Sequence, residues 1–171
     1  LPEISQTLMK NIAKAKKAGD RPVMVLYVNE GALSIEKAMR GEFKIGHDGI
    51  TYREESFMGE VGETKWLVVP GETGVLAESR GKNYATQVSS MRAEYEQLSF
   101  NEAMVVAQIY RAETGKYLYP KSPYTYARTK DLIASGSRAP VGGFDASGLR
   151  VHDHDDGTAD SALGLAVALR N

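Results

Sequence analysis

The clearest local signal in the chain is a helix start at Ser99. Ser99 and Glu102 have the spacing of a capping box, in which each side chain satisfies a backbone N–H that the first helical turn leaves free. Apolar positions then recur at helical spacing, at Ala103, Val106, Ala107 and Tyr110. Gly115 is placed to end the helix in a left-handed conformation. The sequence therefore predicts a helix from Ser99 to Gly115 with one buried face.

A second helix and two strands are predicted before it. Residues 4–18 carry apolar side chains at helical spacing and lysines toward the end, which favours an amphipathic helix over a membrane-surface segment. The continuous apolar run 22–28 predicts a strand buried on both faces, and 65–70 predicts another strand. Residues 72–90, rich in Gly and Ser, are predicted to be a long surface loop.

Residues 35–40 predict a short helix, and 41–53 predict a hairpin around Asp48–Gly49, with His47 as a solvated turn residue. Short strands thus alternate with turns, while the regular strand–helix alternation of a doubly wound parallel sheet is missing. We expect an α+β fold. The 171 residues suit one domain spanning 1–171.

Charge and composition argue against several classes of protein and of functional site. The formal net charge is −1, so we expect no basic face for nucleic acid. The chain has no Cys, which excludes disulfides, thiolate zinc sites and a Cys nucleophile. No apolar run reaches about 18 residues, and Leu1-Pro2-Glu3 does not resemble a leader, so we expect neither membrane insertion nor a signal peptide.

The composition changes abruptly near residue 130. All 11 Lys, 14 Glu, 4 Gln, 6 Met and the single Trp precede residue 131, whereas about 11 residues of these types would be expected in 131–171 at the upstream frequency. The same segment holds 6 of the 8 Asp and 2 of the 3 His. Charge preference does not explain an abundance of Asp beside an absence of Glu.

Codon type explains this pattern. Asp, His and Asn codons end in a pyrimidine, and their purine-ended neighbours encode Glu, Gln and Lys. Met and Trp codons both end in guanine. The segment therefore has the composition of codons that were diversified while the third base stayed a pyrimidine.

The order of motifs in this tail resembles a known family. A Gly-Gly-aromatic start (142–144) is followed by a small-Gly-apolar strand (147–149), a polar run (151–161) and a closing apolar strand with one glycine (163–169). This resembles the C-terminal variable region of proteins diversified by diversity-generating retroelements. In that family, adenine-specific mutagenesis of Asn codons (AAC or AAT) never yields Lys, Glu, Gln, Met or Trp.

The family's variable regions lie on a C-type-lectin fold of the formylglycine-generating-enzyme type. Residues 99–103, 114–116, 119–120 and 124–128 are similar to its helix, its Thr-Gly-Lys helix end, its Leu-Pro turn and its Glu-Tyr-Ala-Arg segment. The resemblance covers about residues 98–170. It departs from the family at Lys121-Ser122 and Leu165-Ala166, and the absence of the required Cys pair excludes formylglycine-generating catalysis.

The resemblance implies two main helices packed on short, mostly antiparallel strands, with a variable region at about 138–165. It implies a non-enzymatic receptor or display protein of viral or prokaryotic type, compatible with a virion or a cell surface. We expect a protein or cell-surface molecule as ligand, with no cofactor and no metal. The candidate ligand-binding residues are Asp145, Ser147, His152, Asp153, His154, Asp155, Asp156, Thr158, Asp160 and Ser161.

Other roles of these residues stay open. His152, His154 and Asp156 alternate along a strand and could form a two-His, one-carboxylate site in a metal-dependent enzyme. The segment could instead provide acid/base groups or be a solvated acidic loop without a role. A structural subunit that assembles through the helix at 4–18 is a third class of function.

Several positions near the tail are expected to be structural. Phe144 should fill the core, as should at least two of Tyr117, Tyr119, Tyr124 and Tyr126, while the others could border a binding surface. The closing strand 163–169 should pair with an earlier strand and bury Leu163, Leu165 and Val167. Gly143 and Gly164 should lie where the chain turns or approaches its neighbours closely.

Overall fold

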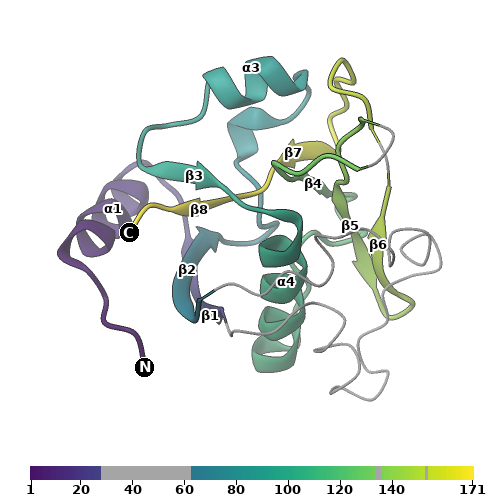
Figure 1. Cartoon of the computed structure of the whole chain (residues 1–171). Coiled ribbons are helices and arrows are strands. Elements are labelled where there is room, and N and C mark those ends of the chain that lie inside the picture. Colours follow the sequence, from purple (N-terminus) through teal and green to yellow (C-terminus); the bar gives the residue numbers. More distant parts are fainter. Residues whose placement is uncertain (28–62, 134–135, 153) are drawn as a thin grey trace.

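Helix α4 (Phe100–Thr114) runs through the middle of the molecule, with strands on both sides (Figure 1). The predicted capping box is confirmed: Ser99 N donates to the Glu102 carboxylate at 2.8 Å, and Glu102 N donates to Ser99 Oγ at 3.1 Å. Gly115 ends the helix at φ 71°. The prediction of a single buried face was too narrow, because Met104, Val105 and Gln108 are also buried between the flanking strands.

The computed structural model describes residues 1–27, 63–133, 136–152 and 154–171. The predicted helix at 35–40 and the predicted hairpin at 41–53, with His47, lie outside these residues. Within them, the chain is a mixed α+β protein with small, mainly antiparallel sheets, as the sequence predicts. None of the helices in the described ranges is long and apolar enough to cross a membrane.

Strand β1 (Pro22–Tyr27) pairs antiparallel with β2 (Lys65–Pro70), in a register from Pro22 opposite Pro70 to Tyr27 opposite Lys65. The prediction that β1 is buried on both faces was wrong. These two strands form a sheet of their own, in which Val25 and Tyr27 are buried while Met24 is exposed.

A second sheet has four strands in the order β6-β5-β4-β7. Its members are β4 (Tyr126–Arg128), β5 (Val141–Asp145), β6 (Gly148–Val151) and β7 (Leu163–Leu165). The β4–β7 pair is parallel, and the other pairs are antiparallel. The two-stranded sheet of β3 (Tyr95–Gln97) and β8 (Val167–Leu169) completes the described strands.

The predicted closing strand is two short strands, β7 and β8, separated by Ala166. Each half pairs with a different earlier strand, β7 with β4 and β8 with β3. Leu163, Leu165 and Val167 are buried, as predicted. The end of the chain therefore joins two sheets.

The segment 72–90 is not the surface loop that its glycines and serines predict. It contains the 3₁₀ turn η3 (Ala77–Ser79) and the helix α3 (Tyr84–Ser89), which Asn83 caps by accepting a hydrogen bond from Thr86 N. Ser79 and Gln87 are buried, and their side chains hydrogen-bond to the backbone of β7. Gln87 Nε2 donates to Leu163 O, and Ser79 Oγ accepts from Leu165 N. Buried polar residues in this segment thus add hydrogen bonds to the apolar packing of Val75 and Leu76.

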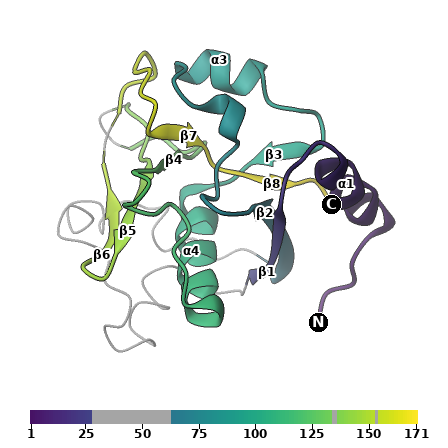
Figure 2. The same cartoon turned by 180° about the vertical axis from the view of Figure 1, so that it is seen from behind.

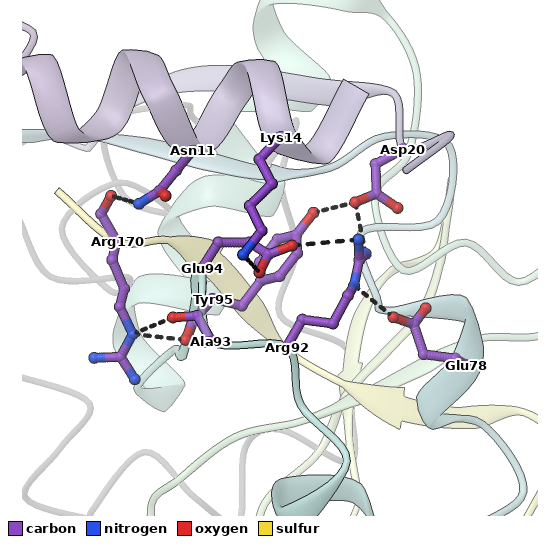
Figure 3. A network of polar contacts seen from close by, with 9 residues as sticks. All are labelled: Asn11, Lys14, Asp20, Glu78, Arg92, Ala93, Glu94, Tyr95 and Arg170. Carbon is purple, nitrogen blue, oxygen red and sulfur yellow. Dashed lines mark hydrogen bonds and ion pairs between the residues drawn. The ribbon is translucent and has the colours of Figure 1, made fainter. Parts of the chain in front are cut away.

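Helix α1 (Gln6–Lys17) begins after the N-cap Ser5, within the predicted range, and the C-terminus lies beside it (Figures 1 and 2). A network of long polar side chains attaches α1 and the following turn to the start of β3 and the residues before it (Figure 3). Lys14 pairs with Glu94 at 2.9 Å, and Arg92 pairs with Asp20 at 2.6 Å and with Glu78 at 2.9 Å.

Candidate functional site

The segment 152–162, here called the tail loop, connects β6 to β7 and lies beside α3, on the side of the molecule opposite α1 (Figures 1 and 2). Asp153 is outside the described residues. At the start of the loop, His152 N donates to Pro140 O at 3.1 Å. His154 and Arg138 exchange two backbone hydrogen bonds of 3.2 Å.

Arg128 of β4 hydrogen-bonds to the middle of the tail loop. Its side chain is fully buried, and its Nη2 donates to the backbone carbonyls of Asp155 at 3.1 Å and Thr158 at 3.2 Å. Nη1 donates to Gln87 Oε1 at 2.9 Å. Burial lowers the pKa of Arg128, while Asp156 and Asp155 raise it, and a guanidinium stays protonated in proteins. A permanent buried cation thus fixes the loop through main-chain oxygens.

The η3–α3 segment contacts the rest of the loop in the same way. Arg80 Nη1 donates to Ser161 O and to Ala162 O, both at 3.2 Å. Three further donors bind backbone carbonyls: Gly81 N to Asp160 O at 3.0 Å, Tyr84 N to Asp156 O at 2.9 Å and Gln87 Nε2 to Leu163 O at 3.1 Å. We call Arg80, Gly81, Tyr84, Gln87 and Arg128 the cradle.

The loop's carboxylates form mostly local contacts. Asp155 Oδ1 accepts from Gly157 N and Asp160 Oδ1 accepts from Ala162 N, each at 2.7 Å. Asp156 Oδ1 pairs with Arg138 Nε at 3.1 Å. The cradle, by contrast, donates to the loop's backbone carbonyls, which every residue type provides.

A cavity of about 140 Å³ lies where the tail loop meets β4. It is lined by Tyr124, Tyr126, His152, His154, Asp160, Ala162 and Leu163. Tyr126 is 3% exposed and Tyr124 is 49% exposed. The Tyr126 ring is nearly perpendicular to three neighbours, with centroid distances of 5.3 Å to Tyr124, 5.0 Å to His152 and 6.4 Å to His154.

The two histidines share a face, as their alternation predicts, with ring centroids 6.3 Å apart. Asp156, the third residue of the hypothetical metal site, pairs with Arg138. In the described parts of the chain, no group of three or more His, Cys, Asp or Glu could hold a metal ion.

Asp145 and Ser147 lie apart from the cavity. Asp145 ends β5 and Ser147 lies in the turn to β6, at the end of that hairpin opposite the paired Val141 and Val151. Asp145 accepts hydrogen bonds from Ser147 Oγ and N and pairs with Lys121 at 3.0 Å, which together lower its pKa. With Ala146, Asp145 borders a separate hollow of about 410 Å³. The structure thus divides the candidate residues between two places.

The predicted structural positions agree with the described fold. Phe144 is buried and packs edge-on against Tyr117 at 4.8 Å, and both Tyr119 and Tyr126 are core residues. Gly143 has φ 56°, and a Cβ there would lie 2.9 Å from Tyr126 Oη. A Cβ at Gly164 would lie 2.7 Å from Val75 Cγ2. Both glycines therefore allow close approaches that other residues would obstruct.

Sequence reasoning missed the cradle. Arg128 follows the buried residues Tyr126 and Ala127, and a cation in such a run needs buried acceptors, which is a usable signal. Asn83 is a recognisable N-cap type for α3. Arg80 and Gln87 have no local signal, because their partners lie about 80 residues later in the chain.

Comparison of the chain with protein-family models, with curated proteins and with solved structures found no match.

Proposed function

We propose that this chain is a non-enzymatic ligand-binding protein whose tail-loop surface is hypervariable and is diversified by a retroelement. Its ligand is a protein or a cell-surface molecule. The observation that carries the proposal is the cradle, which holds the loop by the carbonyls of Asp155, Asp156, Thr158 and residues 160–163. Residues outside the diversified segment supply all five cradle members.

This anchoring suits a surface whose side chains change. Exposed substitutions that remove no structural contact usually alter stability by within about 0.5 kcal/mol. The loop presents short polar side chains, which lose little conformational entropy on binding. The absence of Lys, Glu, Gln, Met and Trp from 131–171 is the composition that adenine-specific change of Asn codons would leave.

For the fold, the proposal is a C-type-lectin fold of the formylglycine-generating-enzyme type. Two main helices, α1 and α4, and mostly antiparallel strand pairs support it, as does the order of motifs over residues 98–170. The paired, buried strands β7 and β8 that follow the tail loop fit the closing strand of that family.

The decisive test of diversification is the encoding locus. We expect a near-identical template copy of the 3′ end beside a reverse-transcriptase gene, with differences confined to template adenines. Sequencing of sibling genomes should then find substitutions at loop positions such as His152, Asp155 and Asp160 and none at the cradle. A locus without a template and a reverse transcriptase would refute the retroelement.

A metal titration separates binding from metal-dependent catalysis. A metal bound by the native state would stabilise it by about 2.7 kcal/mol at a hundredfold excess over its dissociation constant. We expect zinc, manganese and nickel to leave the melting temperature unchanged, and a chelator to have no effect. A saturable shift that His154→Ala abolishes would instead support the enzyme.

A further inference from the structure

The cavity at the tail loop has the size of one side-chain head group. Pockets that enclose a whole small molecule usually measure about 300–1,000 Å³, whereas a cavity of about 150 Å³ holds one benzene-sized group. At about 140 Å³, the cavity bordered by Tyr126 and Asp160 belongs to the second class. Its occupant is therefore a single group that projects from a larger ligand.

The walls of the cavity favour a positive charge. Two tyrosines and two histidines line it, and the faces of tyrosine rings attract cations. Tyr126 forms the floor of the cavity. Its position is fixed, because Gly143 packs against its hydroxyl and its ring contacts those of Tyr124, His152 and His154. Tyr124 is half exposed, so its ring can cover an entering group.

The charge at the cavity has the matching sign. Asp160 is exposed at the rim and uses Oδ1 for its turn with Ala162 N. Among the described lining residues there is neither Lys nor Arg. The cations of the cradle, Arg80 and Arg128, bind loop carbonyls and do not line the cavity.

The geometry points to an arginine or lysine side chain of a protein ligand as the occupant of this cavity. This inference rests on the proposed binding function and specifies the chemistry that this version of the tail recognises. Tyr124 and Tyr126 come from outside the diversified segment and provide a constant aromatic half, while His152, His154 and Asp160 provide the variable half. Changing Asp160 would thus change the preferred charge without moving the floor.

Small probes test the inference without the natural ligand. We would follow the ring signals of His152 and His154 by NMR while titrating Nα-acetyl-arginine amide and Nα-acetyl-lysine amide at constant ionic strength. The matched neutral probe is Nα-acetyl-citrulline amide, which has nearly the shape of the arginine compound but no charge. A methyl glycoside serves as the carbohydrate probe.

We expect saturable shifts with the cationic probes and about tenfold weaker binding of the citrulline compound, which corresponds to about 1.4 kcal/mol. Asp160→Asn keeps the turn acceptor and should weaken arginine binding about threefold to fivefold, as should Tyr124→Leu. Glu113→Gln removes the same charge from an exposed position on α4 and should have no effect.

Equal binding of arginine and citrulline probes, preferential binding of the glycoside, or no binding of either cation would overturn this inference. An equal effect of Glu113→Gln would also overturn it, because only diffuse charge would then be involved. Melting curves of each variant exclude unfolding as the cause. These outcomes leave the proposed function intact, since that depends on the template and on the tolerance of the loop.

Discussion

Helix α1 and the tail loop lie on opposite sides of the molecule and are held by different kinds of contact (Figures 1 and 2). On the α1 side, long charged side chains contact one another, as in Lys14–Glu94 and Arg92–Asp20 (Figure 3). At the tail loop, the cradle donates to backbone carbonyls through the side chains of Arg80, Gln87 and Arg128 and through the main-chain N–H groups of Gly81 and Tyr84. The contacts of α1 therefore depend on the residue types of both partners. The side-chain contacts to the tail loop depend on the residue type of the cradle member but not on that of the loop residue.

This difference matches the change in composition along the chain. The α1 network uses Lys and Glu, which are absent after residue 130. A loop that lacks these residue types cannot be held by Lys–Glu pairs of its own. The cradle removes that requirement, since every residue except proline has the same backbone donor and acceptor. A variable surface can therefore be as well fixed as a constant one.

The largest expected effect distinguishes the core beneath the loop from the loop itself. Phe144→Ala should destabilise the protein by about 3–5 kcal/mol, the usual result of removing an aromatic side chain from a core. His152→Ala should leave the free energy of unfolding nearly unchanged while altering ligand binding. Denaturant unfolding measures the free energies of unfolding of both variants. A silent Phe144→Ala together with an unfolded His152→Ala would refute the division between core and surface.

The next largest effect tests the cradle. Arg128→Met keeps most of the volume but leaves two loop carbonyls and Gln87 Oε1 without their donor, so we expect a loss of about 3 kcal/mol. Hydrogen exchange should increase throughout the tail loop and little in α1. The matched control is the half-buried Arg150→Met, which should cost less than about 1 kcal/mol. Equal effects of the two variants would contradict the role of Arg128.

A smaller effect, dependent on pH, is expected on the α1 side. Burial would raise the pKa of Glu94, but hydrogen bonding from Lys14 and the charge of Arg92 outweigh it, so the pKa is lowered. A lowered pKa stabilises the folded state above the unfolded value near 4.5, and this stabilisation is lost as the pH falls below it. Glu94→Gln should therefore cost about 1–2 kcal/mol at pH 7.

The difference between the wild type and Glu94→Gln should begin to narrow as the pH falls through about 4.5, where Glu94 becomes protonated in the unfolded state, and should be lost below the lowered pKa of the folded state. Chemical denaturation at several pH values measures this difference. Glu96→Gln, two residues further along the chain in β3, is the control and should show little change. A difference that stays constant with pH would show that the Glu94 charge does not stabilise α1.

Local patterns in the sequence predicted local structure well. The capping box at Ser99, the end of α4 at Gly115 and the strand 65–70 all depend on neighbours within a few residues. The prediction of a surface loop at 72–90 was wrong, because the partners of Ser79 and Gln87 lie in β7, far along the chain. The shared face of His152 and His154 followed from strand alternation, whereas the separation of Asp145 from them required the hairpin geometry.

The smallest expected effect tests the central claim most directly. We would replace His152, Asp153, Asp155, Thr158 and Asp160 together by other small or polar residues and follow thermal unfolding. Because the cradle holds the loop by its backbone, the melting temperature should change by only a few degrees, with unfolding still cooperative. Loss of cooperative unfolding in this variant would contradict the account, because the loop's side chains would then be holding the fold.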